Sequence, residues 1–324
     1  MDEFNLIDAY FNWGNSPSDV AVPVGDDAAV INIPAHQQLV ISVDTFISGV
    51  HFPENTPTKA IGHKALAVNL SDLAAMGATP KWFTLALTLP EVDKNWLAEF
   101  TQGLKLLADE HHCYLVGGDT TRGPLSITIQ VMGLVDKGKA MLRSGAKAGD
   151  KIYVTGTLGD AALGLQQPNN KFCKQRLDYP TPRVAESTLI KDYASACLDI
   201  SDGLLQDLSH ILKASNVGAD LNLQDLPLSP SLSEIDRSEA LQYALKGGDD
   251  YDLLFTIPES KQLAFEEKCQ KVGGVYINSA QHKYYCIGTI NAQSGNIRDE
   301  NKQILNVQGY NHFDGSTMET NNGK

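Results

Sequence analysis

Short apolar runs alternate along the chain with amphipathic stretches and with acidic turns. Runs rich in β-branched and aromatic residues, bounded by Gly, Pro, Asn or Asp, predict strands. These predicted strands are residues 28–33, 39–43, 82–89, 113–116, 125–135, 151–155, 195–200, 251–257, 274–277 and 284–290. Apolar residues at three- and four-residue spacing predict helices. The predicted helices are residues 4–13, 60–76, 96–110, 160–165, 204–214 and 238–245. Both halves therefore mix strands and helices, which predicts an α/β fold of the α+β type.

The length of the chain favours two domains. With 324 residues, 42% of them hydrophobic, the chain can bury a sizeable core. A polar, glycine-containing segment at 143–150 is typical of a domain connection. We therefore expect an N-terminal domain over 1–144 and a C-terminal domain over 145–314. The polar segment 315–324 is predicted to be a disordered tail.

Two local predictions concern the N-terminal half. The strands 28–33 and 39–43 are separated by five residues, so a hairpin or a short loop is expected to join them. If they pair as an antiparallel hairpin, Asp27 and Asp44, each at a strand end, lie at one edge of a sheet. The next helix is preceded by Thr56-Pro57, which suggests a threonine hydroxyl as N-cap and proline at the first helical position. Gly77 is the expected stop of that helix.

Charge and cysteine usage exclude several classes of protein. A formal charge of −13 argues against nucleic-acid binding, because a phosphate backbone would be repelled. The five cysteines are widely spaced without a C-x-x-C pair, which favours free thiols in a reducing compartment. No apolar run reaches the roughly 20 residues that span a membrane, and the start lacks a secretory pattern. We expect a cytoplasmic protein without a membrane partner.

Acidic turns are the most informative feature of the sequence. Each combines Asp with Gly or Ser: Gly25-Asp26-Asp27, Ser42-Val43-Asp44, Ser71-Asp72, Gly117-Gly118-Asp119, Asp199-Ile200-Ser201-Asp202-Gly203 and Gly247-Gly248-Asp249-Asp250. Carboxylate oxygens suit a hard cation, and magnesium commonly shares its shell with substrate phosphates. Each turn alone also has an ordinary structural explanation: Ser201 or Asp202 would cap the following helix, and Asp72 would be an exposed helical residue.

Other metals and mechanisms fit the sequence less well. No EF-hand loop is present for calcium, and zinc lacks a set of His or Cys partners. No G-x-S-x-G pattern supports a serine nucleophile, and no P-loop pattern is present. His51 follows Asp44 by seven residues, so it could face the same site or be an ordinary loop histidine.

The ordered series of motifs resembles the thiamine-monophosphate kinase family, within the superfamily of aminoimidazole ribonucleotide synthetase and selenophosphate synthetase. The blocks are residues 25–29, 64–77, 117–124, 143–146, 199–203 and 310–313, and the block around Asp72 is the most specific. The resemblance implies the two-domain fold of aminoimidazole ribonucleotide synthetase. It also implies a homodimer in which the N-terminal sheets of two subunits form a barrel. The implied reaction is ATP-dependent phosphorylation of thiamine monophosphate to thiamine diphosphate, assisted by several Mg²⁺ ions.

Roles follow from the resemblance residue by residue. The implied metal ligands are Asp27, Ser42, Val43, Asp44, Asp72, Asp119, Asp199 and Asp202, of which Asp44, Asp72, Asp119 and Asp202 are the expected catalytic carboxylates. ATP would contact Gly118, Asp119, Arg143 and Ser201. Thiamine monophosphate would contact His51, Asp249 and Tyr310. Val43 stands where the family often has a hydroxyl residue, so its backbone carbonyl would be the ligand.

Two rival interpretations make different predictions. Selenophosphate synthesis would call for a reactive cysteine in an N-terminal loop, whereas the first cysteine here is Cys113. A non-enzymatic acidic metal-binding protein would bind metal without turning over a nucleotide.

Overall fold

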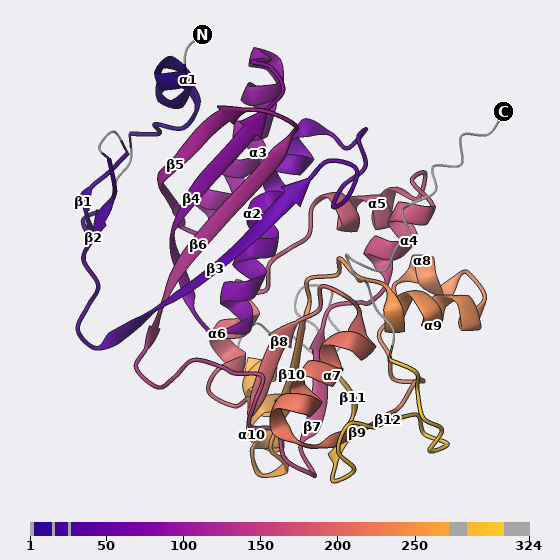
Figure 1. Cartoon of the computed structure of the whole chain (residues 1–324). Helices are drawn as coiled ribbons and strands as arrows, with labels where there is room; N and C mark the ends of the chain where they lie inside the picture. Colours follow the sequence, from indigo (N-terminus) through magenta and orange to yellow (C-terminus); the bar gives the residue numbers. More distant parts are fainter. Residues whose placement is uncertain (1–2, 15–16, 25–26, 272–283, 308–324) are drawn as a thin grey trace, which may run out of the picture.

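Two mixed α/β halves make up the molecule, as Figure 1 shows for this computed structural model. The structure describes residues 3–14, 17–24, 27–271 and 284–307. Tyr310, the turn residues 25–26, the predicted strand 274–277 and the predicted tail therefore lie outside the described residues. The predicted α/β class is confirmed, while the boundary at residue 144 stays a prediction.

The N-terminal half is built on a four-stranded sheet with two helices packed on one face (Figure 1). In spatial order the strands are β3 (Gln37–Ile47), β6 (Ser126–Asp136), β4 (Thr79–Leu89) and β5 (Tyr114–Arg122). The helices α2 (Thr58–Ala75) and α3 (Lys94–Glu110) cross closely because glycines meet backbone there. A Cβ on Gly62 would lie 2.1 Å from the Phe100 carbonyl oxygen, and one on Gly103 would lie 1.9 Å from the Lys59 carbonyl oxygen. A short helix, α1 (Glu3–Tyr10), precedes this sheet.

Helix α2 is the central element of the molecule. It is buried on nearly all sides, as expected for a helix that is apolar around its whole circumference. One side packs on β3 and β6, and another contacts α6 (Val184–Ile190) and β8 (Ala196–Asp199) of the C-terminal half. Side chains on α2 therefore reach both halves of the protein.

The N-cap residue of α2 differs from the prediction. Pro57, not Thr56, is the N-cap residue of α2, and no side chain caps this end. The Thr56 hydroxyl is buried without a hydrogen-bond partner. The predicted end is correct, because Met76 is the C-cap and Gly77 follows with φ of +70°.

The predicted hairpin between 28–33 and 39–43 is wrong. Strand β2 (Val30–Ile31) pairs with β1 (Val20–Val22) in a separate two-stranded sheet. Strand β3 instead pairs with β6 along its whole length, because eleven aligned residues offer many more ladder hydrogen bonds than a two-residue strand. Asp44 consequently lies inside β3 rather than at its end, and it does not share a sheet edge with Asp27.

Strand β3 is an edge strand with an exposed apolar face. Leu39, Ile41, Val43 and Ile47 alternate along it and are all exposed, Ile41 and Val43 by more than half. The opposite face carries Asp44 toward α2. An exposed apolar row on a sheet edge is unusual for a monomer and is typical of an interface.

The C-terminal half contains a six-stranded mixed sheet and most of the remaining helices. Its strands, in spatial order, are β12 (Ile297–Arg298), β9 (Gly218–Leu221), β11 (Tyr284–Asn291), β7 (Lys151–Thr155), β10 (Leu253–Ile257) and β8. Its further helices are α4 (Asp160–Gln166), α5 (Lys171–Asp178), α7 (Leu204–Ser215), α8 (Pro230–Ser233), α9 (Arg237–Lys246) and α10 (Glu259–Lys271). Among the described residues, no helix is both long and apolar enough to cross a bilayer.

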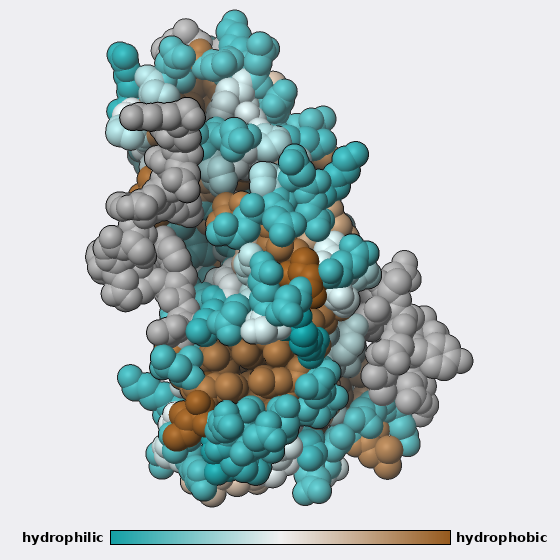
Figure 2. Space-filling view, turned by 90° about the vertical axis from the view of Figure 1, so that its right-hand side faces the viewer, coloured by the Kyte–Doolittle hydropathy of each residue, from teal (hydrophilic) through white to brown (hydrophobic). Residues whose placement is uncertain are grey.

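Hydrophilic and hydrophobic residues are unevenly distributed on one face of the molecule (Figure 2). Figure 2 shows the face on the right-hand side of Figure 1, where α4, α5, α8 and α9 are drawn. Hydrophilic residues cover most of this face, and hydrophobic residues gather in one band below its middle. The hydrophobic surface is therefore concentrated in one region of this face.

Candidate active site

A cavity of about 560 Å³ opens between the two halves, beside α2. Strand β3, the loop after it, α4, the turn after β8 and the segment before β10 supply its walls. It brings together eight residues predicted from the sequence: Val43, Asp44, His51, Asp72, Asp199, Ser201, Asp202 and Asp249. These eight residues are far apart in the sequence, and they meet here because α2 packs against both β3 and β8.

The carboxylates of this cavity repel one another. Burial, followed by the charge of Asp72, raises the pKa of Asp44 to about 6. Burial and then Asp72 raise the pKa of Asp199 to about 8. Burial also raises the pKa of Asp72 itself, against the lowering effects of the Ser42 hydroxyl and of the Arg143 charge. The site thus holds clustered acids whose ionised form a bound cation would favour.

Two serine hydroxyls orient these acids. Ser42 Oγ donates to Asp72 Oδ2 at 2.5 Å, which joins β3 to α2. Ser71 Oγ donates to Asp199 Oδ2 at 2.7 Å, which joins α2 to β8. Ser71 is fully buried, and the sequence analysis did not single it out as a functional residue. The sequence feature that could have identified Ser71 is its position directly before Asp72.

The turn after β8 is held by a residue that the sequence analysis missed. Asp207 Oδ2 accepts hydrogen bonds from the backbone N–H groups of Ser201, Asp202 and Gly203, at 3.0, 3.0 and 3.1 Å. Gly203 is the N-cap of α7, and no side chain makes an N-cap hydrogen bond. The alternative that Ser201 or Asp202 caps this helix is therefore wrong, and both residues line the cavity instead.

His51 stands at the rim where β3 continues into a loop. The Ile47 N–H donates to His51 Nδ1 at 3.0 Å, so a neutral ring carries its proton on Nε2. The ring stacks on Phe46 with centroids 5.4 Å apart. Together these contacts hold the imidazole in a defined orientation in the cavity wall.

Three of the predicted residues lie in a different place. Asp27, Gly118 and Asp119 line a second cavity of about 610 Å³ at the β5 edge of the N-terminal sheet. Asp119 is an exposed residue inside β5, not in a turn after a shorter strand as predicted. A Cβ on Gly118 would lie 2.0 Å from the Leu85 carbonyl oxygen, so only glycine fits against β4.

The sheet register separates the two cavities. Asp119, Ala86, Thr128 and Thr45 form one row across β5, β4, β6 and β3. Three strand spacings of about 4.8 Å place Asp119 about 14 Å from β3. One chain therefore does not bring Asp119 to the carboxylates of the first cavity. Arg143 lies near the first cavity, since its charge acts on Asp72 and on His210.

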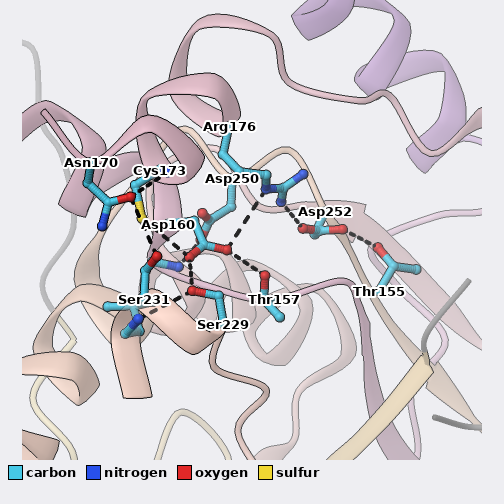
Figure 3. A network of polar contacts seen from close by, with 12 residues as sticks. Thr155, Thr157, Asp160, Asn170, Cys173, Arg176, Ser229, Ser231, Asp250 and Asp252 are labelled. Carbon is cyan, nitrogen blue, oxygen red and sulfur yellow. Dashed lines mark hydrogen bonds and ion pairs between the residues drawn. The ribbon is translucent and has the colours of Figure 1, made fainter. Parts of the chain in front are cut away.

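The segment before β10 is anchored by a buried charge network (Figure 3). Asp252 is fully buried and accepts hydrogen bonds from Arg176 Nη2 at 2.8 Å, Arg183 Nε at 2.6 Å and Thr155 Oγ1 at 2.8 Å. Asp250 accepts from the Gly159 N–H at 2.7 Å. These contacts tie the segment to α4 and α5, and they leave Asp249 to face the cavity.

The donor chemistry of the first cavity suits a hard divalent cation. Within the described ranges, no three His, Cys, Asp or Glu side chains already converge on one metal-binding point. Carboxylate and hydroxyl oxygens are nevertheless clustered there. Burial and then the charge of Asp72 raise the pKa values of Asp44 and Asp199, so a bound cation would stabilise their ionised forms. Such an open, all-oxygen set fits magnesium, which usually completes its shell with water and substrate phosphates.

Comparison with known proteins places the chain in a class and then in a family. Residues 25–135 match the family described as AIR synthase related protein, N-terminal domain, and residues 147–294 match its C-terminal domain. The chain thus has the two domains of an AIR synthase related protein.

Relatives within this class are similar over nearly the whole length. Thiamine-monophosphate kinase of Salmonella typhimurium is 44% identical over 96% of this chain and 98% of its own, and that of Haemophilus influenzae is 42% identical over 97% and 98%. The crystal structure of thiamine-monophosphate kinase from Stenotrophomonas maltophilia K279a has a TM-score of 0.83 at 41% identity, covering 93% of this chain and 97% of that one. The complex of AaThiL with AMPPCP and TMP has a TM-score of 0.74 at 30% identity, covering 96% and 97%. The chain belongs to the thiamine-monophosphate kinase family, which confirms the resemblance seen in its motifs.

Proposed function

We propose that this protein is a kinase that transfers the γ-phosphoryl group of ATP to thiamine monophosphate, giving ADP and thiamine diphosphate in thiamine diphosphate biosynthesis. The observation that carries the proposal is the cavity in which acidic residues from both halves converge, in a chain 44% identical to a thiamine-monophosphate kinase over 96% of its length. A related structure holds AMPPCP and TMP together.

The chemistry of this reaction matches the residues of the cavity. A phosphate monoester has a second pKa near 6, so the acceptor is already largely dianionic at neutral pH. It needs no strong general base. It does need two polyanions to be neutralised and held in line, which is mainly a matter of position and electrostatics. Paired carboxylates serve this purpose when they hold divalent cations, whereas a catalytic triad would add nothing.

Magnesium is the proposed cation, and it would screen and bridge the phosphates. In the first cavity Asp44, Asp72, Asp199 and Asp202 would hold it, together with Ser42 and the backbone carbonyl of Val43. Ser42 and Ser71 keep the carboxylates of Asp72 and Asp199 in place. Asp27 and Asp119 of the second cavity complete the proposed metal set.

The nucleotide and the acceptor would bind on different sides of these acids. Gly118, Asp119, Arg143 and Ser201 are the proposed ATP contacts. Gly118 and Asp119 are exposed and line the second cavity side by side, which supports their role. His51, Asp249 and Tyr310 are the proposed contacts of thiamine monophosphate. The first two share one cavity, and its aromatic and aliphatic wall suits an organic ring.

A homodimer would join the two cavities. In the proposed barrel, the β5 edge of one subunit lies beside the β3 edge of the other, which buries the exposed row of Leu39, Ile41 and Val43. This arrangement would carry the partner subunit's Asp119 toward Asp44 and remove the separation of about 14 Å within one chain. Dimerisation would thus complete the active site as well as cover an apolar edge.

The activity is tested with purified protein, Mg-ATP and thiamine monophosphate, scored for both ADP and thiamine diphosphate. Stoichiometric formation of the two products is the expected result. Unphosphorylated thiamine and phosphate monoesters other than thiamine monophosphate serve as acceptor controls, and selenide tests the rival activity. Cys113 is buried and its thiol pKa is raised by burial, which argues against a role for it in selenophosphate synthesis. No diphosphate product at saturating substrates would refute the proposed function.

Mixed dimers test the shared site. Asp72→Asn and Asp119→Asn homodimers should each be inactive. If one site combines Asp72 of one subunit with Asp119 of the other, a purified mixed dimer keeps one intact site and about half of the wild-type activity. If each site lies within one chain, both sites of the mixed dimer are defective and no activity returns. Wild-type homodimers prepared with the same two tags are the control.

The cytoplasmic location predicted from the sequence stays a prediction.

A further inference from the structure

Lys64 is a buried cation whose role the proposed reaction does not explain. It lies on α2 with 3% of its side chain exposed, among apolar neighbours of the same helix. A buried ammonium is strongly disfavoured unless a charged or polar partner compensates for its lost hydration. The position of its partner therefore indicates what the lysine does.

That partner is Asp249, on the other half of the molecule. Lys64 Nζ lies 3.0 Å from Asp249 Oδ2. Asp249 is one-third exposed and lines the cavity between the halves, whereas Lys64 lies behind it. The ion pair consequently connects the central helix to a residue that faces the ligand space.

The second oxygen of this carboxylate is also held. Tyr251 Oη donates to Asp249 Oδ1 at 3.0 Å, and the tyrosine is itself buried. Each carboxylate oxygen therefore receives one hydrogen bond from the protein and retains further capacity as an acceptor. Two donors on different elements fix the plane of the carboxylate, which a single ion pair would leave free to rotate.

The backbone conformation supports a positioning role. Asp249 and Tyr251 have φ of +68° and +51°, in the left-handed region that side chains other than glycine seldom adopt. Hydrogen bonds from the Asp249 N–H to the Ser201 carbonyl oxygen and from the Tyr251 N–H to the Ile200 carbonyl oxygen, both 2.9 Å, hold this conformation. A strained segment that the surrounding structure holds in place is characteristic of functional sites.

Asp249 differs from the other acids of the cavity in its electrostatic partner. Asp44, Asp72 and Asp199 repel one another, which suits cation binding. Asp249 already has a buried cation as its partner, so it does not need a metal for charge compensation. It is better suited to accept a hydrogen bond from an N–H group of a ligand.

We propose that Lys64, with Tyr251, is a positioning residue that holds Asp249 as the acceptor for the exocyclic amine of the aminopyrimidine ring of thiamine monophosphate. The inference rests on the proposed function and adds a specificity device to it. Lys64 acts through Asp249 and does not itself touch the substrate.

Kinetics of Lys64→Met test this role, because methionine keeps the length of the side chain and removes its charge. The KM for thiamine monophosphate should rise on the order of tenfold, as expected for a misplaced charged hydrogen bond. The KM for ATP and kcat should change less than about twofold. Tyr251→Phe keeps the ring and removes one donor, so a smaller rise in the same KM is expected. Lys105→Met removes a lysine paired with Asp109 on the remote helix α3 and should leave both KM values unchanged.

A double-mutant cycle distinguishes positioning from a general structural effect. If Lys64 acts through Asp249, Lys64→Met should cause little further change of KM in an Asp249→Asn background. Additive effects of the two substitutions, or equal changes of both KM values, would overturn the inference. So would an unchanged KM for thiamine monophosphate in both Lys64→Met and Tyr251→Phe. Absence of turnover by the wild-type protein would refute the proposed function and this inference with it, so the two failures are distinguishable.

Discussion

The hydrogen bond from Ser71 to Asp199 offers a sharp test of how the acidic cavity is organised. Ser71 is fully buried on α2, and its hydroxyl lies 2.7 Å from Asp199 Oδ2 on β8. Ser71→Ala removes this donor and little else. The remaining carboxylate is 8% exposed, so water cannot readily replace the lost bond.

The size of the effect follows from the charge of the acceptor. Hydrogen bonds to charged groups contribute about 1.5–3 kcal/mol. Losing this one should therefore lower the equilibrium constant for ionisation of Asp199 by about 10- to 100-fold. The Ser71 hydroxyl lowers the pKa of Asp199, which burial already raises to about 8. Loss of the hydroxyl therefore raises the pKa of Asp199 further. At neutral pH, Asp199 is then protonated in a larger fraction of the molecules, and a cation must displace this proton before it binds.

The assay is a titration of kinase activity with Mg²⁺ at fixed substrate concentrations. We expect the Mg²⁺ concentration for half-maximal activity to rise about 10-fold or more, because residues that orient metal ligands typically affect metal affinity by that factor. The acid limb of the pH profile should move to higher pH, while the KM for thiamine monophosphate should stay unchanged.

Ser187→Ala is the matched control. Ser187 is also buried, and its hydroxyl donates to the Ala74 carbonyl oxygen near the end of the same helix rather than to a carboxylate. It should reduce thermal stability without changing the Mg²⁺ requirement. If both variants show the same Mg²⁺ dependence as wild type, the hydroxyl of Ser71 has no role in the metal site.

Three further outcomes are expected. Asp44→Asn should abolish turnover while leaving the circular dichroism spectrum and thermal unfolding close to wild type, and near-normal activity would remove Asp44 from the metal set. Ile41→Glu places a charge on the exposed row of β3 and should convert the proposed dimers to monomers in sedimentation experiments, with loss of activity; an active monomer would contradict the shared site. In EDTA, thermal stability should fall as pH rises from about 4 to about 8. The pKa values of Asp44 (about 6) and Asp199 (about 8) in the folded protein lie above the value near 3.9 in the unfolded chain. In this pH range the folded protein therefore binds protons that it releases on unfolding, so a higher pH favours unfolding. Mg²⁺ should offset this loss more at pH 8 than at pH 5, and Asp199→Asn should flatten the decline; a stability that rises from pH 5 to 8 in EDTA would contradict the raised pKa values.

The sequence by itself determined most of the elements. Helix α2 and strands such as β4, β6 and β7 were predictable because apolar periodicity is a local property. The acidic turns identified the chemistry, since repeated carboxylates beside Gly or Ser supply the oxygen ligands that a hard cation prefers. They predicted hard-cation binding, and the order of the motifs indicated the family.

Only the tertiary structure decided how these pieces meet. The pairing of β3 with β6 rather than with a neighbouring segment depends on a partner about ninety residues away, which local periodicity does not specify. The same holds for the donors Ser71 and Lys64, because their partners lie in the other half of the molecule. The separation of Asp119 from Asp44 follows from strand order, since two strands lie between β5 and β3. The residues that bear the chemistry were therefore visible in the sequence, but the contacts that position them are long-range and become defined only when α2 packs between the two halves.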